Sequence, residues 1–215
     1  MFTIQCDFDS TITVADVGAT LLETFGPRNW RQIEEEFRSG EISAEEEIRR
    51  QFANMQVTHQ AVLDLVARTA EVRPGFLQLV DYCRRESMRF VIVSNGLDIY
   101  IESILLKLGL SDLEWYSARA GVTPEGVAVN YIYPERANLE EGFKLAWLRH
   151  LQADGKPIIC IGDAISDIPP ALEADHVIAR SELQDHFHLN QFPHYTFETF
   201  HDIHDHLQEL RHLYT

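Results

Sequence analysis

Residues 2–11 read FTIQCDFDST, a short apolar run that ends abruptly in acidic and hydroxyl side chains. A short apolar run stopped by polar residues is typical of a buried β-strand. Two later stretches repeat this pattern, because residues 90–96 read FVIVSNG and residues 157–167 read PIICIGDAISD. Residues 176–179 form a further apolar run. The sequence therefore predicts buried strands at these positions, three of them followed directly by a polar cluster.

Helical patterns separate the predicted strands. Apolar residues recur at helical spacing in residues 76–86, 97–108, 138–152 and 199–213. Strands that alternate with helices indicate a parallel sheet covered on both faces. We therefore expect an α/β fold with a Rossmann-like parallel sheet as its core.

Residues 14–72 differ from the rest of the chain. They contain many charged residues, and their apolar residues recur at helical spacing. This segment is too long for a simple crossover between two strands, and we expect it to form an inserted helical cap. Helices are predicted in residues 23–38, 44–54 and 58–69. The expected division is a core of residues 1–13 and 73–215 and a cap of residues 14–72.

Within the cap, the acidic runs at residues 34–36 and 45–47 are predicted to lie on the surface. The aromatic side chains of Phe25, Trp30 and Phe52 are predicted to pack in the interior of the cap.

The composition limits the partners of the chain. Its 215 residues carry a formal charge of −16, from 18 basic and 34 acidic side chains. This charge disfavours nucleic acid and anionic membranes, but a small anionic substrate remains compatible with a locally positive pocket. No signal peptide and no apolar run of about 20 residues is visible. Cys6, Cys83 and Cys160 fit no zinc motif. Cys6 and Cys160 lie in predicted strands and are expected to be buried thiols, which favours a reducing compartment and a cytoplasmic protein.

The polar clusters after the strands are expected to meet, because ligands of open α/β sheets bind at the carboxyl ends of the strands. Four carboxylates, from Asp7, Asp9, Asp163 and Asp167, would then share a small volume and repel each other. A divalent cation removes this repulsion, and hard oxygen ligands without His or Cys favour Mg²⁺.

An anion site is expected beside the cation. Ser94 offers a hydroxyl group, and Asn95 and Gly96 offer backbone N–H groups at a predicted helix start. Adjacent sites for a cation and an anion suggest phosphoryl transfer.

These motifs resemble the haloacid dehalogenase-like superfamily. That family carries Asp-x-Asp-x-Thr after its first strand, a Ser or Thr after its second, a downstream Lys, and Gly-Asp-x-x-x-Asp after a later strand. The matching residues here are Asp7, Asp9, Thr11, Ser94, Lys144, Gly162, Asp163 and Asp167. The resemblance covers the chain in order and implies the phosphatase branch, with a cap between the first two motifs.

The resemblance also implies roles for these residues. Asp7 would be the nucleophile that forms an aspartyl-phosphate, and Asp9 the general acid and base. Mg²⁺ would be bound by the side chains of Asp7 and Asp163 and by the backbone carbonyl of Asp9. Phosphate oxygens would be held by Ser94, Asn95 and Lys144, with Lys156 as a rival lysine. Supporting roles fall to Thr11, Gly96, Gly162 and Asp167.

Two groups within the family compete as models for the substrate. The phosphoserine phosphatases have Glu where this chain has Asp16, Arg where it has Gln51, and Asn where it has Ser166. The phosphatases of methionine salvage, which act on 2-hydroxy-3-keto-5-methylthiopentenyl-1-phosphate, are similar in the cap, around Asp16, residues 24–27 and Arg50. Their Cys-rich segment before the lysine is absent. The second group is favoured, with Asp16 and Arg50 as substrate-binding residues.

Other hypotheses stay open from the sequence alone. A phosphotransferase would share the covalent step, and a non-catalytic phosphate-binding protein could share the fold. The histidine-rich region near the C-terminus, including His201 and His204, lacks acidic or Cys partners at metal-site spacing and is predicted to be a solvated helix surface.

Overall fold

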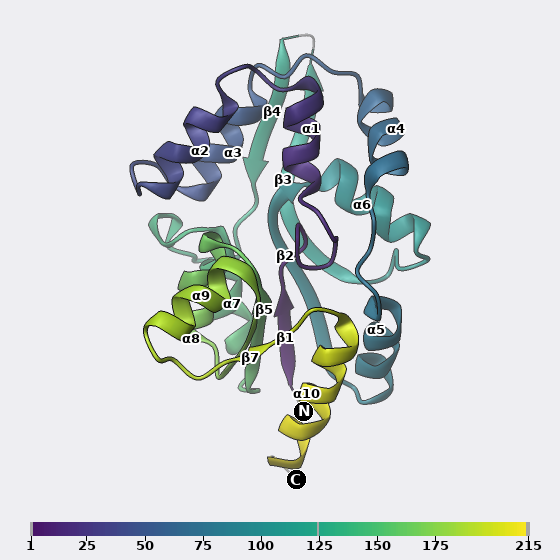
Figure 1. Ribbon diagram of the computed structural model, residues 1–215, viewed down its shortest axis with the longest axis vertical. Coiled ribbons are helices and arrows are strands. Elements are labelled where there is room, and N and C mark those ends of the chain that lie inside the picture. The colour runs from purple at the N-terminus through teal and green to yellow at the C-terminus, as the bar shows by residue number, and fades with distance from the viewer. Residues whose placement is uncertain (1, 124, 214–215) are drawn as a thin grey trace.

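The computed structural model describes residues 2–123 and 125–213, which form a mostly parallel β-sheet with helices on both faces (Figure 1). The strands of the described residues are β1 (Thr3–Cys6), β2 (Arg89–Leu97), β3 (Glu114–Thr123), β4 (Gly126–Tyr131), β5 (Ile158–Gly162), β6 (His176–Ala179) and β7 (Tyr195–Thr196). Their order in the sheet is β4-β3-β2-β1-β5-β6-β7. Neighbouring strands are parallel except β3 and β4, which form an antiparallel hairpin. The predicted fold class is confirmed.

Strand β1 lies in the middle of the sheet and is buried along its whole length. It pairs with β2 on one side and β5 on the other, so that Cys6 is level with Ile92 and Ile161. The residues that follow these three positions therefore emerge together at the carboxyl edge of the sheet. This register brings the polar clusters of the sequence to one place.

Side chains of the strands alternate between two faces. Ile4, Ile159 and Ile178 pack on one face, whereas Cys160 and Val177 pack on the other. The first face is covered by α5 (Phe76–Arg85), α6 (Asp98–Lys107) and α10 (Phe200–Leu213). The second is covered by α7 (Phe143–Gln152), α8 (Ile168–Glu173) and α9 (Ser181–Leu189). Two short 3₁₀ helices, η1 (Leu139–Glu141) and η2 (Ile165–Asp167), precede α7 and α8.

The segment between β1 and α5 forms four helices beyond the carboxyl edge of the sheet (Figure 1). They are α1 (Val17–Phe25), α2 (Trp30–Arg38), α3 (Ala44–Phe52) and α4 (His59–Thr69). The two ends of the segment meet, because Thr13 bridges Val72 and the Arg73 N–H donates to the Ile12 carbonyl at 2.8 Å. The division into a core and a cap at these points stays a prediction.

The helices of this segment differ from the prediction in one respect. Residues 23–38, predicted as one helix, belong to α1 and α2, which are separated by Gly26 and Pro27. Pro27 has no N–H to donate and disfavours a helical residue before it, and Gly26 is accordingly extended with a ψ of 164°. Both residues therefore end the first helix.

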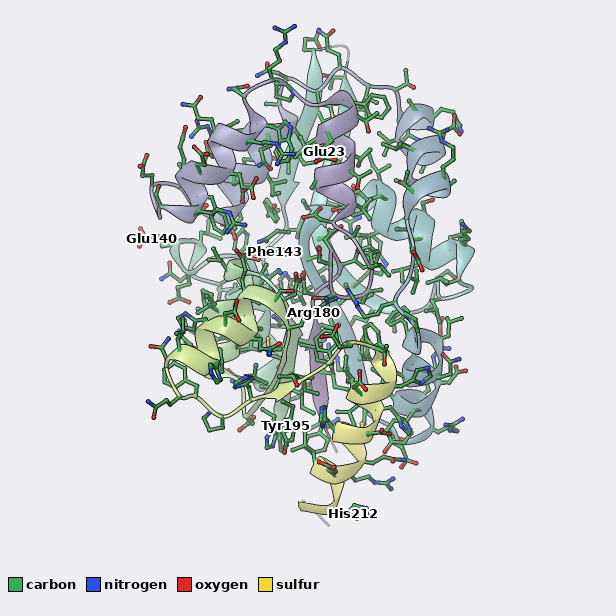
Figure 2. The ribbon with its side chains drawn as sticks, in the orientation of Figure 1. Glu23, Glu140, Phe143, Arg180, Tyr195 and His212 are labelled. Atoms are coloured by element: carbon green, nitrogen blue, oxygen red, sulfur yellow. The ribbon has the colours of Figure 1, made fainter. Side chains whose placement is uncertain are left out.

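The hairpin of β3 and β4 reaches up to the inserted helices (Figure 1). Gly126 lies against the backbone of Ala53, where a Cβ would come within 1.8 Å of the carbonyl oxygen. Phe143, at the start of α7, lies on the side of the core that faces α2 and α3 (Figure 2). None of the helices in the described residues is long and apolar enough to cross a membrane.

Candidate active site

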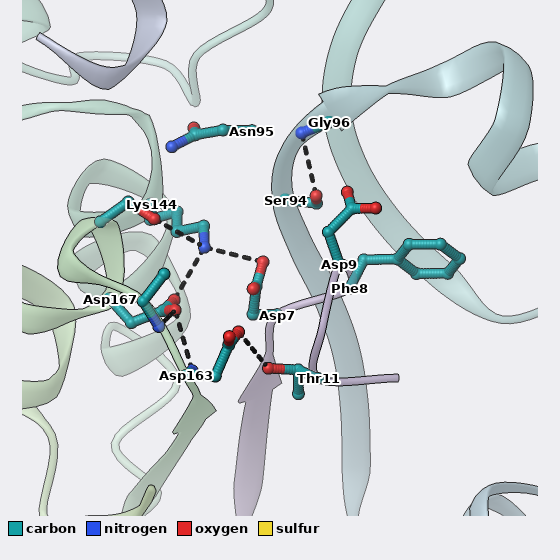
Figure 3. Close-up of polar contacts among 12 residues, drawn as sticks. Asp7, Phe8, Asp9, Thr11, Ser94, Asn95, Gly96, Lys144, Asp163 and Asp167 are labelled. Carbon is teal, nitrogen blue, oxygen red and sulfur yellow. Dashed lines mark hydrogen bonds and ion pairs between the residues drawn. The ribbon is translucent and has the colours of Figure 1, made fainter. Parts of the chain in front are cut away.

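The carboxyl ends of β1, β2 and β5 bring Asp7, Ser94 and Asp163 together (Figure 3). The Asp7 backbone N–H donates to the Ile161 carbonyl at 2.9 Å, which fixes the first residue after β1 beside β5. Side-chain oxygen atoms of Asp7, Asp163 and Asp167 all lie within 4.8 Å of one another. Residues separated by more than 150 positions therefore form one carboxylate cluster.

Lys144 supplies the positive charge of this cluster. Its Nζ lies 2.7 Å from Asp7 Oδ1 and 2.8 Å from Asp167 Oδ1, and its side chain is only 4% exposed. Burial opposes its charge, but the carboxylates of Asp167 and Asp7 more than offset this and raise the pKa of Lys144. The rival Lys156 lies two residues before the start of β5 and so at the opposite, amino edge of the sheet. The structure places Lys144, and not Lys156, among the acidic residues.

The three carboxylates exceed the single lysine in charge. Burial raises the pKa of Asp7, and the neighbouring Asp167 raises it further. Burial and then Asp7 raise the pKa of Asp163. Such shifts are expected where carboxylates are confined without enough positive charge, and a bound divalent cation would reverse them.

The oxygen atoms of Asp167 already have partners. Oδ1 accepts from Lys144, and Oδ2 accepts from the backbone N–H groups of Asp163 and Ala164 at 3.2 and 3.1 Å. Asp163 Oδ1 accepts from the Thr11 hydroxyl at 2.9 Å. Asp167 therefore positions Lys144 and the start of the loop after β5, which leaves Asp7 and Asp163 as the better cation ligands.

The carboxylate of Asp9 lies to one side of the carboxylate cluster, beside Ser94 and Gly96 (Figure 3), and it lines the same cavity as Asp7. Its Oδ2 accepts from the Tyr100 hydroxyl at 2.6 Å, and its Oδ1 accepts from the Val17 N–H at 2.9 Å. Burial, followed by the charge of Asp16, raises the pKa of Asp9 well above its ordinary value. Asp9 is thus held by the first inserted helix and by the core at the same time.

The Ser94–Gly96 cluster differs from the prediction of a helix start. These residues are the last part of β2, and α6 begins only at Asp98. The Gly96 N–H donates to the Ser94 hydroxyl at 3.0 Å, while the Asn95 carbonyl accepts from Tyr131 at 2.8 Å. The extended backbone still brings Ser94 and Asn95 to the cavity beside Lys144.

Two glycines are required by close approach. A Cβ at Gly96 would lie 1.9 Å from the Tyr100 hydroxyl and 2.5 Å from Asp9 Oδ2. A Cβ at Gly162 would lie 2.4 Å from Asp167 Cγ. Both glycines therefore make room for the side chains that the site uses.

Two further residues of the site were not predicted from the sequence. Tyr100 is one, because its contact with Asp9 depends on how α6 packs. Arg73 is the other, a buried residue whose guanidinium donates to the backbone carbonyls of Ser10, Thr11 and Thr13. It holds the loop that follows Asp9. A lysine or arginine at the end of an inserted segment is too common to have been a signal.

A cavity of about 370 Å³ opens between this site and the inserted helices. Its apolar wall comes from α1, α2 and α3 and includes Leu22, Trp30, Phe37, Ile48 and Phe52. Trp30 and Phe52 are buried, as predicted for the cap interior, and they also face the cavity.

The two predicted substrate-binding residues have different positions. Asp16 lines the cavity and caps α1 by accepting from the Ala19 N–H at 2.7 Å. Arg50 is not among the described residues that line the cavity, and its guanidinium forms an ion pair with Glu36 at 2.5 Å. Arg38 lines the cavity instead, paired with Glu34 and Glu182.

The acidic runs of the inserted helices are not purely surface features, which corrects the prediction. Glu45 and Glu47 of α3 are buried, with 5% and 9% exposure, whereas Glu46 between them has a side chain 46% exposed. Burial, together with Glu34 and Asp16, raises the pKa of Glu47 to about 8. Glu47 and Glu34 both line the cavity.

Within the described residues, Asp7, Asp163 and Asp167 form the one group of three or more His, Cys, Asp or Glu side chains close enough to hold a metal. The histidines near the C-terminus therefore make no such cluster in that part of the chain. Cys6, Cys83 and Cys160 are buried free thiols.

A mostly parallel sheet with carboxylates and a lysine at its carboxyl edge has the arrangement of the α/β proteins that bind their ligands at this edge. The family model of the haloacid dehalogenase-like hydrolases matches residues 4–172. The chain belongs to this family, and the predicted resemblance is confirmed.

Relatives of known name carry the comparison further. A 2-hydroxy-3-keto-5-methylthiopentenyl-1-phosphate phosphatase of Brevibacillus brevis is 33% identical over 210 residues, which cover 96% of this chain and 95% of the relative. A protein of the same name from Bacillus mycoides is 30% identical and covers 98% and 96% of the two chains. The expectation of a phosphatase is thus confirmed by the family together with these relatives.

Solved structures support the fold. A phosphoserine phosphatase, solved as a phospho-aspartyl intermediate analogue, superimposes with a TM-score of 0.71 at 19% identity. The match covers 96% of this chain and 97% of that one. At this identity the likeness extends to the fold, not to the substrate.

Proposed function

We propose that this protein is a Mg²⁺-dependent phosphomonoesterase that works through an aspartyl-phosphate at Asp7. The contact that carries the proposal is the buried lysine between two carboxylates, with Lys144 Nζ 2.7 Å from Asp7 and 2.8 Å from Asp167. A buried lysine beside a nucleophile offers a fixed cation for the oxygens of a transferring phosphoryl group. Asp167 keeps that lysine in place.

The reaction follows from the residues in two steps. A carboxylate oxygen of Asp7 bonds to phosphorus while the bond from phosphorus to the ester oxygen breaks, and Asp9 gives its proton to the leaving oxygen. Water then attacks the acyl-phosphate, Asp9 takes back a proton, and inorganic phosphate leaves with Asp7 restored. The raised pKa of Asp9 suits the first step, because the protonated form is the donor.

The residues fit a bound cation. Asp7 and Asp163 provide hard oxygen ligands within 4.8 Å of each other, and the Asp9 backbone carbonyl is the proposed third protein ligand. Mg²⁺ bound there would neutralise the nucleophile and orient the phosphate. Ser94, Asn95 and Lys144 would hold the remaining phosphate oxygens.

The favoured substrate is 2-hydroxy-3-keto-5-methylthiopentenyl-1-phosphate or a similar phosphate ester whose carbon chain carries no charge, and phosphoserine is the alternative. The two arginines that line the cavity already have carboxylate partners, since Arg31 pairs with Glu23 and Arg38 with Glu34 and Glu182. A substrate carboxylate would have to displace them and would face Asp16, Glu34 and Glu47. The apolar wall and a protonated Glu47, which can donate to a keto or hydroxyl oxygen, suit a neutral thioether chain. The names of the two relatives point the same way.

The covalent step is tested with the change Asp7→Asn. This variant should fold and bind Mg²⁺ but release no phosphate from p-nitrophenyl phosphate, and acid-quenched wild-type enzyme should carry one phosphoryl group by intact mass. EDTA should abolish wild-type activity and added Mg²⁺ restore it. Hydrolysis by the Asp7→Asn variant near the wild-type rate would rule out the mechanism.

The substrate is tested by comparing kcat/KM for the methylthiopentenyl phosphate and for phosphoserine. We expect a preference of about 10- to 100-fold for the former, because a carboxylate left without a partner costs about 1–3 kcal/mol. Equal or reversed preference would refute the assignment. Acceptor alcohols should not raise the rate of p-nitrophenol release; an increase with transfer product would favour a phosphotransferase.

A further inference from the structure

One contact links the inserted helices directly to the helix that carries Lys144. Glu45, in α3, accepts a hydrogen bond through Oε1 from the Phe143 backbone N–H at 2.5 Å. The two residues are 98 positions apart. Both are buried, with Glu45 5% and Phe143 1% exposed.

The position of this contact is the amino end of α7. Phe143 is the first residue of that helix, and its N-cap is Gly142, which has a φ of +86° and no side chain to accept a hydrogen bond. The first N–H groups of a helix have no partner inside the helix and require one from elsewhere. Glu45 therefore serves as the capping side chain that α7 lacks, and its negative charge also suits the positive end of the helix.

Lys144 is the next residue of α7. Its backbone carbonyl accepts from Gln5 Nε2 in β1 at 3.1 Å, and its Nζ reaches Asp7 and Asp167. The first turn of α7 is thus held by β1 from within the core and by Glu45 from the inserted helices. Movement of this turn would move the lysine that lies 2.7 Å from the proposed nucleophile.

A second contact of α3 supports the same coupling. The guanidinium of Arg49, one turn after Glu45, lies 5.6 Å from the centre of the Tyr131 ring. Tyr131 packs against Phe143 with ring centres 4.9 Å apart, and its hydroxyl donates to the Asn95 carbonyl at 2.8 Å. Helix α3 therefore contacts Phe143, which precedes Lys144, and Tyr131, which binds the Asn95 carbonyl.

We infer that Glu45 is a positioning residue that caps α7 from the inserted helices. The position of Lys144 therefore depends on the packing of α3 against the core. Loss of the Glu45 contact would leave the first turn of α7 without this capping acceptor and would loosen Lys144, the next residue of the helix. Phosphate binding would then weaken even though Asp7 and Asp167 remain in place. This inference rests on the proposed function, because it assigns phosphate binding to Lys144.

The test is the affinity for inorganic phosphate, measured by titration calorimetry with saturating Mg²⁺. Phosphate contacts the lysine but is too small to need the apolar wall of the cavity. Glu45→Ala should weaken phosphate binding by about tenfold, in line with loss of a charge-assisted capping bond, and lower kcat for p-nitrophenyl phosphate. Glu45→Gln keeps an acceptor oxygen and should stay within about threefold of wild type. Glu46→Gln, a partly exposed neighbour on the same helix, is the matched control and should bind as wild type.

Thermal melts establish that each variant is folded. If Glu45→Ala does not fold, Glu45→Asp replaces it, because a side chain one methylene shorter withdraws the oxygen from Phe143 but keeps the charge. Wild-type phosphate affinity in a folded Glu45→Ala or Glu45→Asp variant would overturn the inference and leave the proposed function standing. Absence of phosphate binding and of p-nitrophenyl phosphate hydrolysis in the wild type would instead refute the proposed function.

Discussion

Replacing Glu47 by Gln should stabilise the protein, and the gain should grow as the pH rises from 5 to 8. Glu47 is buried in α3, and its Oε1 accepts from Gln51 Nε2 at 3.1 Å. Burial and the nearby charges of Glu34 and Asp16 raise its pKa from 4.5 to about 8. Glutamine has nearly the same shape and keeps the acceptor oxygen for Gln51, but it does not ionise.

The sign follows from proton linkage. A carboxyl group whose pKa is raised on folding binds its proton more tightly in the folded state. Its stabilising contribution is therefore complete below about pH 4.5 and is lost as the pH rises toward 8. The whole shift corresponds to about 5 kcal/mol at ~1.4 kcal/mol per pH unit, an upper bound because relaxation and water entry lower the penalty. We expect the variant to gain about 2 kcal/mol or more over the wild type between pH 5 and pH 8.

Urea unfolding at fixed Mg²⁺ concentration, repeated from pH 5 to pH 9, measures this difference. The difference in unfolding free energy between Glu47→Gln and wild type should rise with pH and level off above pH 8. Glu46→Gln, whose side chain is 46% exposed and pairs with Arg49 at 3.5 Å, should show a small and pH-independent difference. A flat profile for Glu47→Gln would refute the argument that Glu47 is protonated in the folded protein.

Three further predictions concern the site and its cavity. Gly96→Ala should lower kcat by about 100-fold, because its Cβ would collide with Tyr100 and Asp9. Steady-state kinetics measures this loss, and a thermal melt like that of the wild type shows that the variant is folded. Tyr100→Phe removes a 2.6 Å hydrogen bond that favours the charged form of Asp9 and should therefore raise the pKa of Asp9. The acidic limb of the plot of kcat against pH should move to higher pH. An unmoved limb would contradict the role of Asp9 as a base. Arg38→Ala should raise KM by about tenfold, because it leaves the carboxylates of Glu34 and Glu182 unpaired at the cavity. Arg50→Ala should change KM by less than about twofold, because Arg50 pairs with Glu36 away from the cavity. The reverse order of effects would support the prediction that Arg50 binds the substrate.

The central strands and the acidic cluster could be predicted because local sequence determines them. Strands β2 and β5 contain continuous apolar runs and β1 is a short, partly apolar one, and in a parallel sheet the residues after such strands meet at one edge. Asp7 and Asp163 follow from this rule alone. Lys144 does not, because it lies on a helix, where a lysine is usually a surface residue, and its assignment needed the family resemblance.

The residues that sequence reasoning missed are those whose role depends on packing between distant elements. Tyr100 reaches Asp9 across 91 positions, and Arg73 donates to the Thr11 carbonyl across 62 positions. Neither residue type marks a site on its own. The Ser94–Gly96 cluster was expected at a helix start because Asn and Gly favour turns, but β2 continues to Leu97, which pairs with Ala118, and the cluster forms an irregularity in the pairing between Val93 and Leu97.

The acidic run of α3, residues 45–47, was predicted to lie on the surface, but Glu45 and Glu47 are buried. Three consecutive glutamates predict a solvated helix surface when a helix has one buried face. Successive helical residues are turned by about 100°, so Glu45 and Glu47 point in nearly opposite directions, with Glu46 between them. Helix α3 buries both directions, because Glu45 meets the start of α7 while Glu47 faces the cavity. A helix that packs between the core and a binding cavity has no single hydrophobic stripe. Its buried polar residues are the ones that contact the core and the cavity. Burial of alternate charged residues in such a helix therefore identifies α3 as the element through which the inserted helices can act on the site.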